Sequence, residues 1–119
     1  MTFKFARTVW ANKELAKLCP NHDIKRLGEL FTIEDFNEQV IATQKMMLIM
    51  NEAYIRRFKF EHRGEEPDSA EMTMEALDNM TDEEIGLLMD KMVETMAIDD
   101  KTSVDAEPKK DEAKEQTSN

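Results

Sequence analysis

The chain has 119 residues, of which 40% are apolar and 35% charged, and its formal net charge is −10. This length and apolar share fit one modest hydrophobic core, so a single domain with a polar tail is expected. No apolar run approaches the roughly 20 residues that span a bilayer. Lys4 and Arg7 also interrupt the N-terminal apolar residues, unlike a signal peptide.

The charge is unevenly distributed along the chain. Residues 1–63 contain 11 Lys/Arg and 8 Asp/Glu, net +3, whereas residues 64–119 contain 5 and 18, net −13. Such an acidic half repels nucleic acid and anionic lipid, so neither nucleic acid nor a membrane is expected as a partner. Cys19 is the single cysteine, which excludes an internal disulfide and predicts a soluble, cytoplasmic protein.

The apolar spacing predicts a mainly α fold, a small helical domain built on one long central helix. Before the first helix, residues 2–8 (TFKFART) alternate polar and apolar side chains, which indicates a short N-terminal strand. No second strand is evident in the sequence, so this strand would pair with another copy or another protein. A first helix over 8–18, which Pro20 ends, and a short second helix that Asp23 caps follow.

The longest predicted element is a helix over about 32–63, with Thr32 as its N-cap. Its main apolar stripe contains Ile33, Phe36, Val40, Met47, Tyr54 and Phe58. Around KMMLIM the apolar surface widens, because Met46, Ile49 and Met50 lie outside that stripe. A helix that is apolar around most of its circumference must be covered on two sides.

The acidic half of the chain begins with a polar linker over 64–72. An acidic helical part over 73–98 follows, in which Thr81 and Glu84 have the spacing of a capping box. Its apolar stripe contains Ile85, Leu88, Met89, Met92, Val93 and Met96. Residues 1–98 are therefore predicted to form the helical domain, and 99–119 a disordered charged tail.

Residues with reactive or metal-binding side chains are sparse. Cys19 and His22 are three positions apart but lack the further ligands of a zinc site, and His62 lies near a helix end. The acids Asp78, Asp82, Glu83 and Glu84 lack the spacing and the glycine of a calcium loop, so helix capping explains them better. We therefore predict a non-catalytic protein without a metal or cofactor.

The segment IRRFKFEHR, residues 55–63, combines cations with aromatic residues. This mixture is compatible with a small nucleic-acid patch. Cations are also expected at the C-terminal end of a helix, and the segment is a place where the acidic half can fold back. The acidic charge downstream favours these two structural explanations.

Nine of the ten methionines, all but Met1, gather in two helical segments. Methionine is unbranched and polarizable, so a methionine-lined face can repack around different partners. A bundle core is the alternative explanation, and we favour it for most of the second segment. For Met46 and Met50 of the first segment we favour exposure to a partner, because a chain this short has little else to cover both sides of the long helix. The predicted partner-binding residues are Met46, Ile49, Met50, Met89 and Met92.

Taken in order, several segments resemble a tail assembly chaperone of long-tailed bacteriophages that infect Gram-positive hosts. They are FKFART, LAKLCP, HDIKRLGELF, KMMLIMNEAYIRRFKFE, TDEEIGLLMDKMVETM and TSVDAEPKKDEAKEQ. The resemblance implies a small helical protein of the host cytoplasm that oligomerises and keeps the long tape measure protein soluble until tail tube protein assembles around it. It also implies that a longer, frameshifted form is joined in the charged tail. It transfers no site residue, because the family has no invariant binding motif.

A different class also fits the charge: an acidic regulatory module of the anti-repressor or anti-sigma type that occupies a basic partner. Its binding energy would come from Asp and Glu and would fall steeply with salt. Chaperone binding through methionine would persist in high salt and would be lost in Met46→Asp with Met50→Asp.

Overall fold

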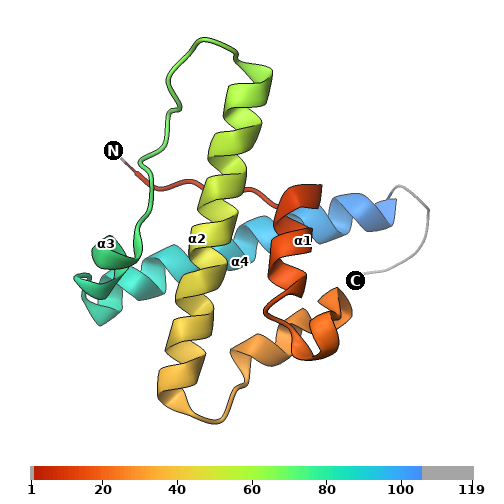
Figure 1. The fold of residues 1–119 in the computed structure, drawn as a ribbon, viewed down its shortest axis with the longest axis vertical. Helices are drawn as coiled ribbons and strands as arrows, with labels where there is room; N and C mark the ends of the chain where they lie inside the picture. Colours follow the sequence, from red (N-terminus) through yellow and green to blue (C-terminus); the bar gives the residue numbers. More distant parts are fainter. Residues whose placement is uncertain (1, 106–119) are drawn as a thin grey trace.

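Six helical segments make up the part of the chain that the computed structural model describes, residues 2–105, with side chains to Met96. They are α1 (Val9–Ala16), η1 (Pro20–His22), η2 (Ile24–Phe31), α2 (Phe36–Glu61), α3 (Met74–Asp78) and α4 (Asp82–Asp105), with η1 and η2 in 3-10 geometry (Figure 1). The prediction of a small, mainly helical domain around one long helix is confirmed by the 26 residues of α2. None of the helices described combines the length and apolarity needed to cross a membrane.

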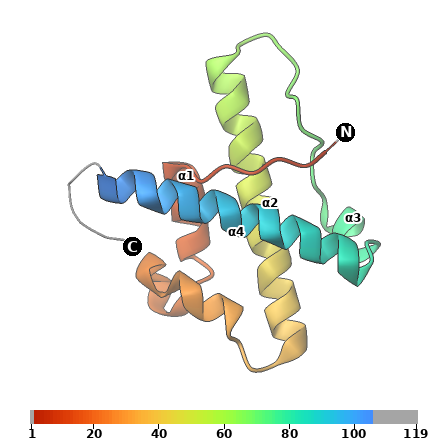
Figure 2. The same cartoon turned by 180° about the vertical axis from the view of Figure 1, so that it is seen from behind.

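The helices are arranged in two layers. α1, η2 and α2 lie in one layer, and α4 crosses behind α2 in Figure 1 and in front of it in Figure 2. The molecule measures 43 × 41 × 28 Å, so each layer presents one broad face. α2 contacts α1, η2, α3 and α4, whereas α4 packs mainly against α2. One side of α4 consequently faces away from the rest of the molecule.

Methionine dominates the interior between the layers. Met46, Met47 and Met50 of α2 and Met92 of α4 are each 0% exposed. Leu15 of α1 joins them in the same cluster. Because an unbranched thioether side chain fills irregular gaps, methionine suits a core formed by helices that cross rather than run side by side.

All the described helices except η1 begin at a side-chain cap, and one of these caps differs from the prediction. Thr81 and Glu84 form the predicted capping box, with Thr81 N–H donating to Glu84 Oε1 at 2.9 Å and Glu84 N–H donating to Thr81 Oγ1 at 3.2 Å. The prediction that Thr32 caps the long helix is wrong. Its backbone N–H still donates to Glu29 O in η2 at 3.2 Å, so the chain has not yet left the preceding helix. Asp35 caps α2 instead.

The N-terminal segment is extended, but residues 2–8 form no β-ladder, so the predicted strand is wrong. Lys4 N–H donates to Ser69 Oγ, and Ala70 N–H donates to Thr2 O, each at 3.0 Å. Asn51 and the carbonyl of Met50 on α2 take up further hydrogen bonds of the segment. The segment thus pairs with the linker of its own chain. The sequence does not predict this pairing, because the linker lacks the alternating polar and apolar residues of a strand.

The acidic half follows the predicted order of a linker and then helices. α3 lies within the expected acidic helical part, and α4 begins there. α4 extends to Asp105, past the predicted start of the disordered tail at Asp99, so the first part of that tail is helical. Residues 106–119 lie outside the described residues.

Candidate protein-binding surface

The described cysteine and histidine side chains have structural or solvent-exposed surroundings. Cys19 is buried, and its thiol donates to the carbonyl of Leu15 at 3.4 Å; desolvation raises the pKa of this thiol, and nearby acidic side chains add to the shift. His22 is exposed, and the ring of His62 lies on Phe58 with centroids 4.5 Å apart. Within the described part of the chain, no three Cys, His, Asp or Glu side chains are grouped as a metal site.

The acids around the start of α4 have structural partners or face solvent. Asp78 Oδ1 accepts from Gln44 Nε2 at 2.9 Å and so links α3 to α2. Glu84 belongs to the capping box, and Asp82 and Glu83 are exposed in the first turn of α4. Acidic side chains in a first helical turn are stabilised by the positive end of the helix dipole. This arrangement matches the capping explanation of these residues.

The predicted methionine surface is not a surface in this fold. The expectation that Met46 and Met50 are exposed is wrong, and Met92 is equally buried. Ile49 and Met89 are partly buried and pack against the same core. The physical reason is that the chain covers α2 by itself: α1 packs beside α2 in the same layer, and α4 and the N-terminal segment both lie across one face of it (Figure 2).

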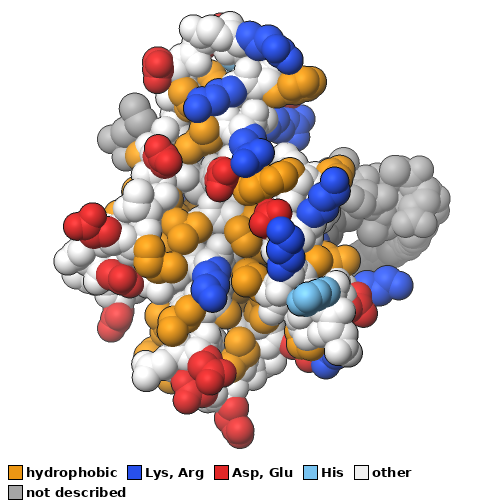
Figure 3. Space-filling model, viewed as in Figure 1, with side chains coloured by type: hydrophobic (Ala, Val, Ile, Leu, Met, Phe, Trp, Pro, Cys, Tyr) orange, Lys and Arg blue, Asp and Glu red, His pale blue; other side chains and the backbone are white. Residues whose placement is uncertain are grey.

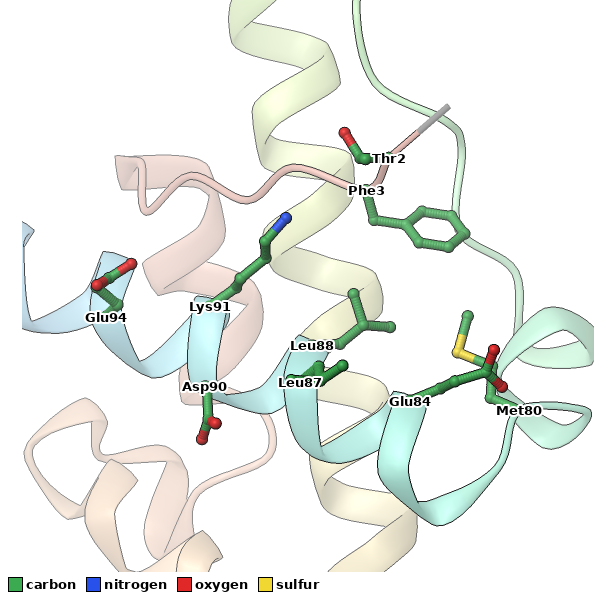
Figure 4. A pocket seen from close by; sticks show the side chains of 9 residues that line it. All are labelled: Thr2, Phe3, Met80, Glu84, Leu87, Leu88, Asp90, Lys91 and Glu94. Atoms are coloured by element: carbon green, nitrogen blue, oxygen red, sulfur yellow. The ribbon is translucent and has the colours of Figure 1, made fainter.

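The apolar surface that stays open lies instead along α4. A groove of about 560 Å³ runs between α4 and the N-terminal segment, and we call it the α4 groove. Figure 4 shows Thr2 and Phe3 on one side of it and Leu87, Leu88 and Lys91 on the other. Its remaining lining residues are Met80, Glu84, Asp90 and Glu94. The floor is therefore apolar and the rim mostly acidic.

Leu87 is the most exposed apolar residue of this groove, at 62%. Leu87 and Leu88 are adjacent, and neighbouring helical residues point about 100° apart, so one stripe cannot bury both. Leu88 packs against the core and Leu87 points outward. The sequence contains this signal, because Leu87 is an apolar residue that lies outside the predicted apolar stripe of this helix.

A second groove, of about 540 Å³, lies on another side of α4, and we call it the Phe36 groove. Phe36, which is 73% exposed at the start of α2, lines it. Its other apolar lining residues are Phe31, Val40, Leu77, Met80, Ile85 and Met89. Met80 belongs to both grooves, so they meet at the start of α4. Phe36 was predicted within the core stripe, which is wrong because the first turn of α2 extends beyond the layer that would cover it.

The broad face on the α1 and α2 side of the molecule, away from α4, carries a basic strip. We define it as Lys13 and Lys17 of α1 and Lys45, Arg56 and Lys59 of α2. All five are exposed. Figure 3 shows Lys and Arg side chains over α1 and α2, with hydrophobic side chains between them. The guanidinium of Arg56 lies 4.1 Å from the centre of the Trp10 ring and bonds to Glu52 at 2.9 Å. Among the described residues, the ion pairs of this layer are local, joining Lys17 to Glu14, Arg56 to Glu52 and Arg57 to Glu61, and none joins the basic strip to the acidic half.

No protein-family model, curated protein or solved structure was found that matches this chain.

Proposed function

We propose that this chain is a non-catalytic tail assembly chaperone that binds apolar helical stretches of a tape measure protein in the two grooves beside α4. The observation that supports the proposal is the open apolar surface on α4 around Leu87, which no part of the described chain covers. Apolar grooves with a polar rim are the usual docking place of an amphipathic helix. A long helical client offers many such stretches.

The composition of the surface suits a protein that keeps a client soluble. The apolar residues of the grooves can bind client helices of different sequences. The acidic rim gives the complex a net charge that opposes aggregation. The buried methionines support the same role indirectly, because a core of flexible side chains lets α4 adjust its position when a client docks.

The grooves are tested by aspartate substitutions at exposed apolar residues. Phe36→Asp and Leu87→Asp place a charge in the Phe36 groove and the α4 groove, and an acid at the first position of α2 is compatible with the helix dipole. Phe60→Asp is the matched control, because Phe60 is 70% exposed and lines neither groove. Each variant is co-expressed with a tape measure protein, and the soluble complex is quantified.

We expect the two groove variants to lose the soluble complex and Phe60→Asp to keep it. We also expect the complex of the native chain to persist in high salt, since apolar burial is not screened. If the amount of soluble complex is unaffected by both groove substitutions but falls steeply as salt is raised, the chaperone proposal is refuted and the acidic regulatory module is favoured.

A further inference from the structure

The outward side of α4 carries more acidic than basic side chains around its exposed leucine. Glu83, Asp90 and Glu94 are exposed, and none of them forms an ion pair with a described residue. Their spacings of seven and four residues place them in one row along the helix, and Leu87 lies within the same row. We call this row the acidic strip. Lys91 is the only cation among the described side chains of α4.

The acidic strip and the α4 groove are parts of one surface. Asp90 and Glu94 line the groove, to which Leu87 and Leu88 contribute apolar side chains (Figure 4). A partner that covers Leu87 therefore comes close to both carboxylates and removes part of their hydration. A carboxylate that loses water without gaining a cation or a hydrogen-bond donor destabilises the complex. The surface thus favours a partner that brings cations together with its apolar residues.

We propose that the α4 groove selects basic amphipathic helices, in which Lys or Arg flanks the apolar residues on the side that meets the acidic strip. This selectivity rests on the function proposed above and adds the charge of the client segment to it. Asp90 and Glu94 are one helical turn apart, so cations one turn apart on a helix lying along α4 can meet both. Glu83 lies about 10 Å further along at about 1.5 Å per residue, where a cation seven residues away fits.

Uncharged and acidic helices match this surface less well. An uncharged helix leaves the acids of the strip unpaired, and an acidic helix places like charges against them. Lys91 alone does not offset this repulsion, because it is one cation beside three acids. The net charge of −10 attracts any basic peptide, wherever its cations lie. Selection by the acidic strip therefore has to depend on the position of the client's cations and not only on their number.

Model peptides test this selectivity, because each represents a single client segment. Four alanine-based helical peptides of about 20 residues share the same stripe of leucines. Three of them carry lysine, glutamine or glutamate beside the leucines, at spacings of four and seven residues. The fourth has the same number of lysines, moved to the side opposite its leucines. The affinity of each peptide for the full chain is measured by calorimetry at low and at high salt.

Three variants of the protein locate the effect. Asp90→Lys with Glu94→Lys reverses the charge beside the groove. Glu65→Lys with Glu66→Lys, in the exposed loop after α2, changes the net charge by the same amount and is the matched control. Leu87→Asp removes the apolar contact on which the proposed function depends. Circular dichroism confirms that each variant is folded.

We expect the native chain to bind the peptide with flanking lysines about tenfold more tightly than the peptide with flanking glutamates. It is also expected to bind the peptide with displaced lysines more weakly than the one with flanking lysines. The charge-reversed variant is expected to prefer the glutamate peptide, and the loop control to keep the native order. High salt narrows these differences, whereas binding of the glutamine peptide persists because it is apolar. Leu87→Asp is expected to weaken the binding of all four peptides.

The selectivity is overturned if the charge-reversed variant keeps the native order of affinities. It is also overturned if the two lysine peptides bind the native chain equally, because net charge then explains their attraction. In either case the apolar groove of the proposed function stands, provided that Leu87→Asp weakens the glutamine peptide. If none of the peptides binds, or if Leu87→Asp weakens none of them, both the selectivity and the function proposed for this groove are refuted.

Discussion

Asn51→Ala is expected to be among the most destabilising substitutions in this chain, because one buried carboxamide ties α2 to two extended segments. Asn51 is 1% exposed. Its Nδ2 donates to Lys4 O at 3.0 Å and to Ser69 Oγ and Ala70 O at 3.2 Å, and its Oδ1 accepts from Met72 N–H at 2.9 Å. Its removal leaves the N-terminal segment and the linker without their common anchor.

The magnitude follows from this hydrogen-bond inventory. An amide group has two hydrogens for these three acceptors, so the carboxamide makes about three bonds of full strength, each with a net contribution of about 1 kcal/mol. The two bonds donated by Nδ2 therefore account for about 2 kcal/mol. The N–H of Met72 is left buried without an acceptor, which costs about 1–3 kcal/mol in place of the net contribution of that bond, so we expect a total loss of about 3–5 kcal/mol. This is a large fraction of the roughly 5–15 kcal/mol by which domains of this size are stable.

The assay is urea denaturation followed by far-ultraviolet circular dichroism, with the free energy of unfolding compared at equal m-value. Asn79→Ala is the matched control, because Asn79 is exposed and its Nδ2 makes one bond, to Glu75 O at 2.8 Å. We expect less than about 1 kcal/mol for that control. If Asn51→Ala lowers the free energy of unfolding no more than Asn79→Ala does, the anchoring role of Asn51 is refuted.

Two further predictions concern the core and the N-terminal segment. Met92→Ala is expected to lower the free energy of unfolding by about 2–5 kcal/mol, because Met92 is fully buried. Val93→Ala, at the neighbouring and partly exposed position, is expected to lower it by less than about 1 kcal/mol. Equal losses of stability in urea titrations of the two variants would contradict the position of α4. At Asp68, the hydrogen bond from Lys4 and then that from Tyr54 lower the pKa of the carboxyl below its ordinary value. Its stabilising contribution is therefore present above the unfolded-state pKa of about 3.9 and lost as pH falls through the lower folded-state pKa. Midpoints measured across this acid range are expected to fall less in Asp68→Asn than in the native chain, and parallel curves would show that the contact contributes nothing.

The helices of this chain are predictable because their signals are local. The capping box at Thr81 and Glu84 and the apolar period of α2 both act within a few residues, and both appear in the structure. The start of α2 was placed too early because Thr32 and Asp35 are both good caps. Which of them is used depends on how far η2 continues, and sequence spacing does not determine that.

The candidate site was less predictable because it depends on what covers each helix. The sequence indicates that the apolar surface of α2 around Met46 and Met50 needs cover on two sides, but it does not indicate which element covers it. Part of it is the N-terminal segment, whose Ala6 N–H donates to Met50 O at 3.0 Å. This extended segment is held by hydrogen bonds to Asn51 and to the polar linker. Such hydrogen bonds leave no periodic pattern of apolar residues in the sequence, so the position of the segment cannot be predicted from it.

The position of α4 explains why the open apolar surface lies there rather than on α2. α2 is covered by the N-terminal segment, α1 and η2 as well as α4, and its outward side is charged. α4 forms the second layer alone and packs mainly against α2, so an apolar residue off its inner stripe has nothing of the described chain to cover it. Leu87 is such a residue, and it lies in the same row as Glu83, Asp90 and Glu94. An exposed leucine among unpaired acids on the outer layer is better explained by a partner with apolar and basic groups than by the stability of this chain alone.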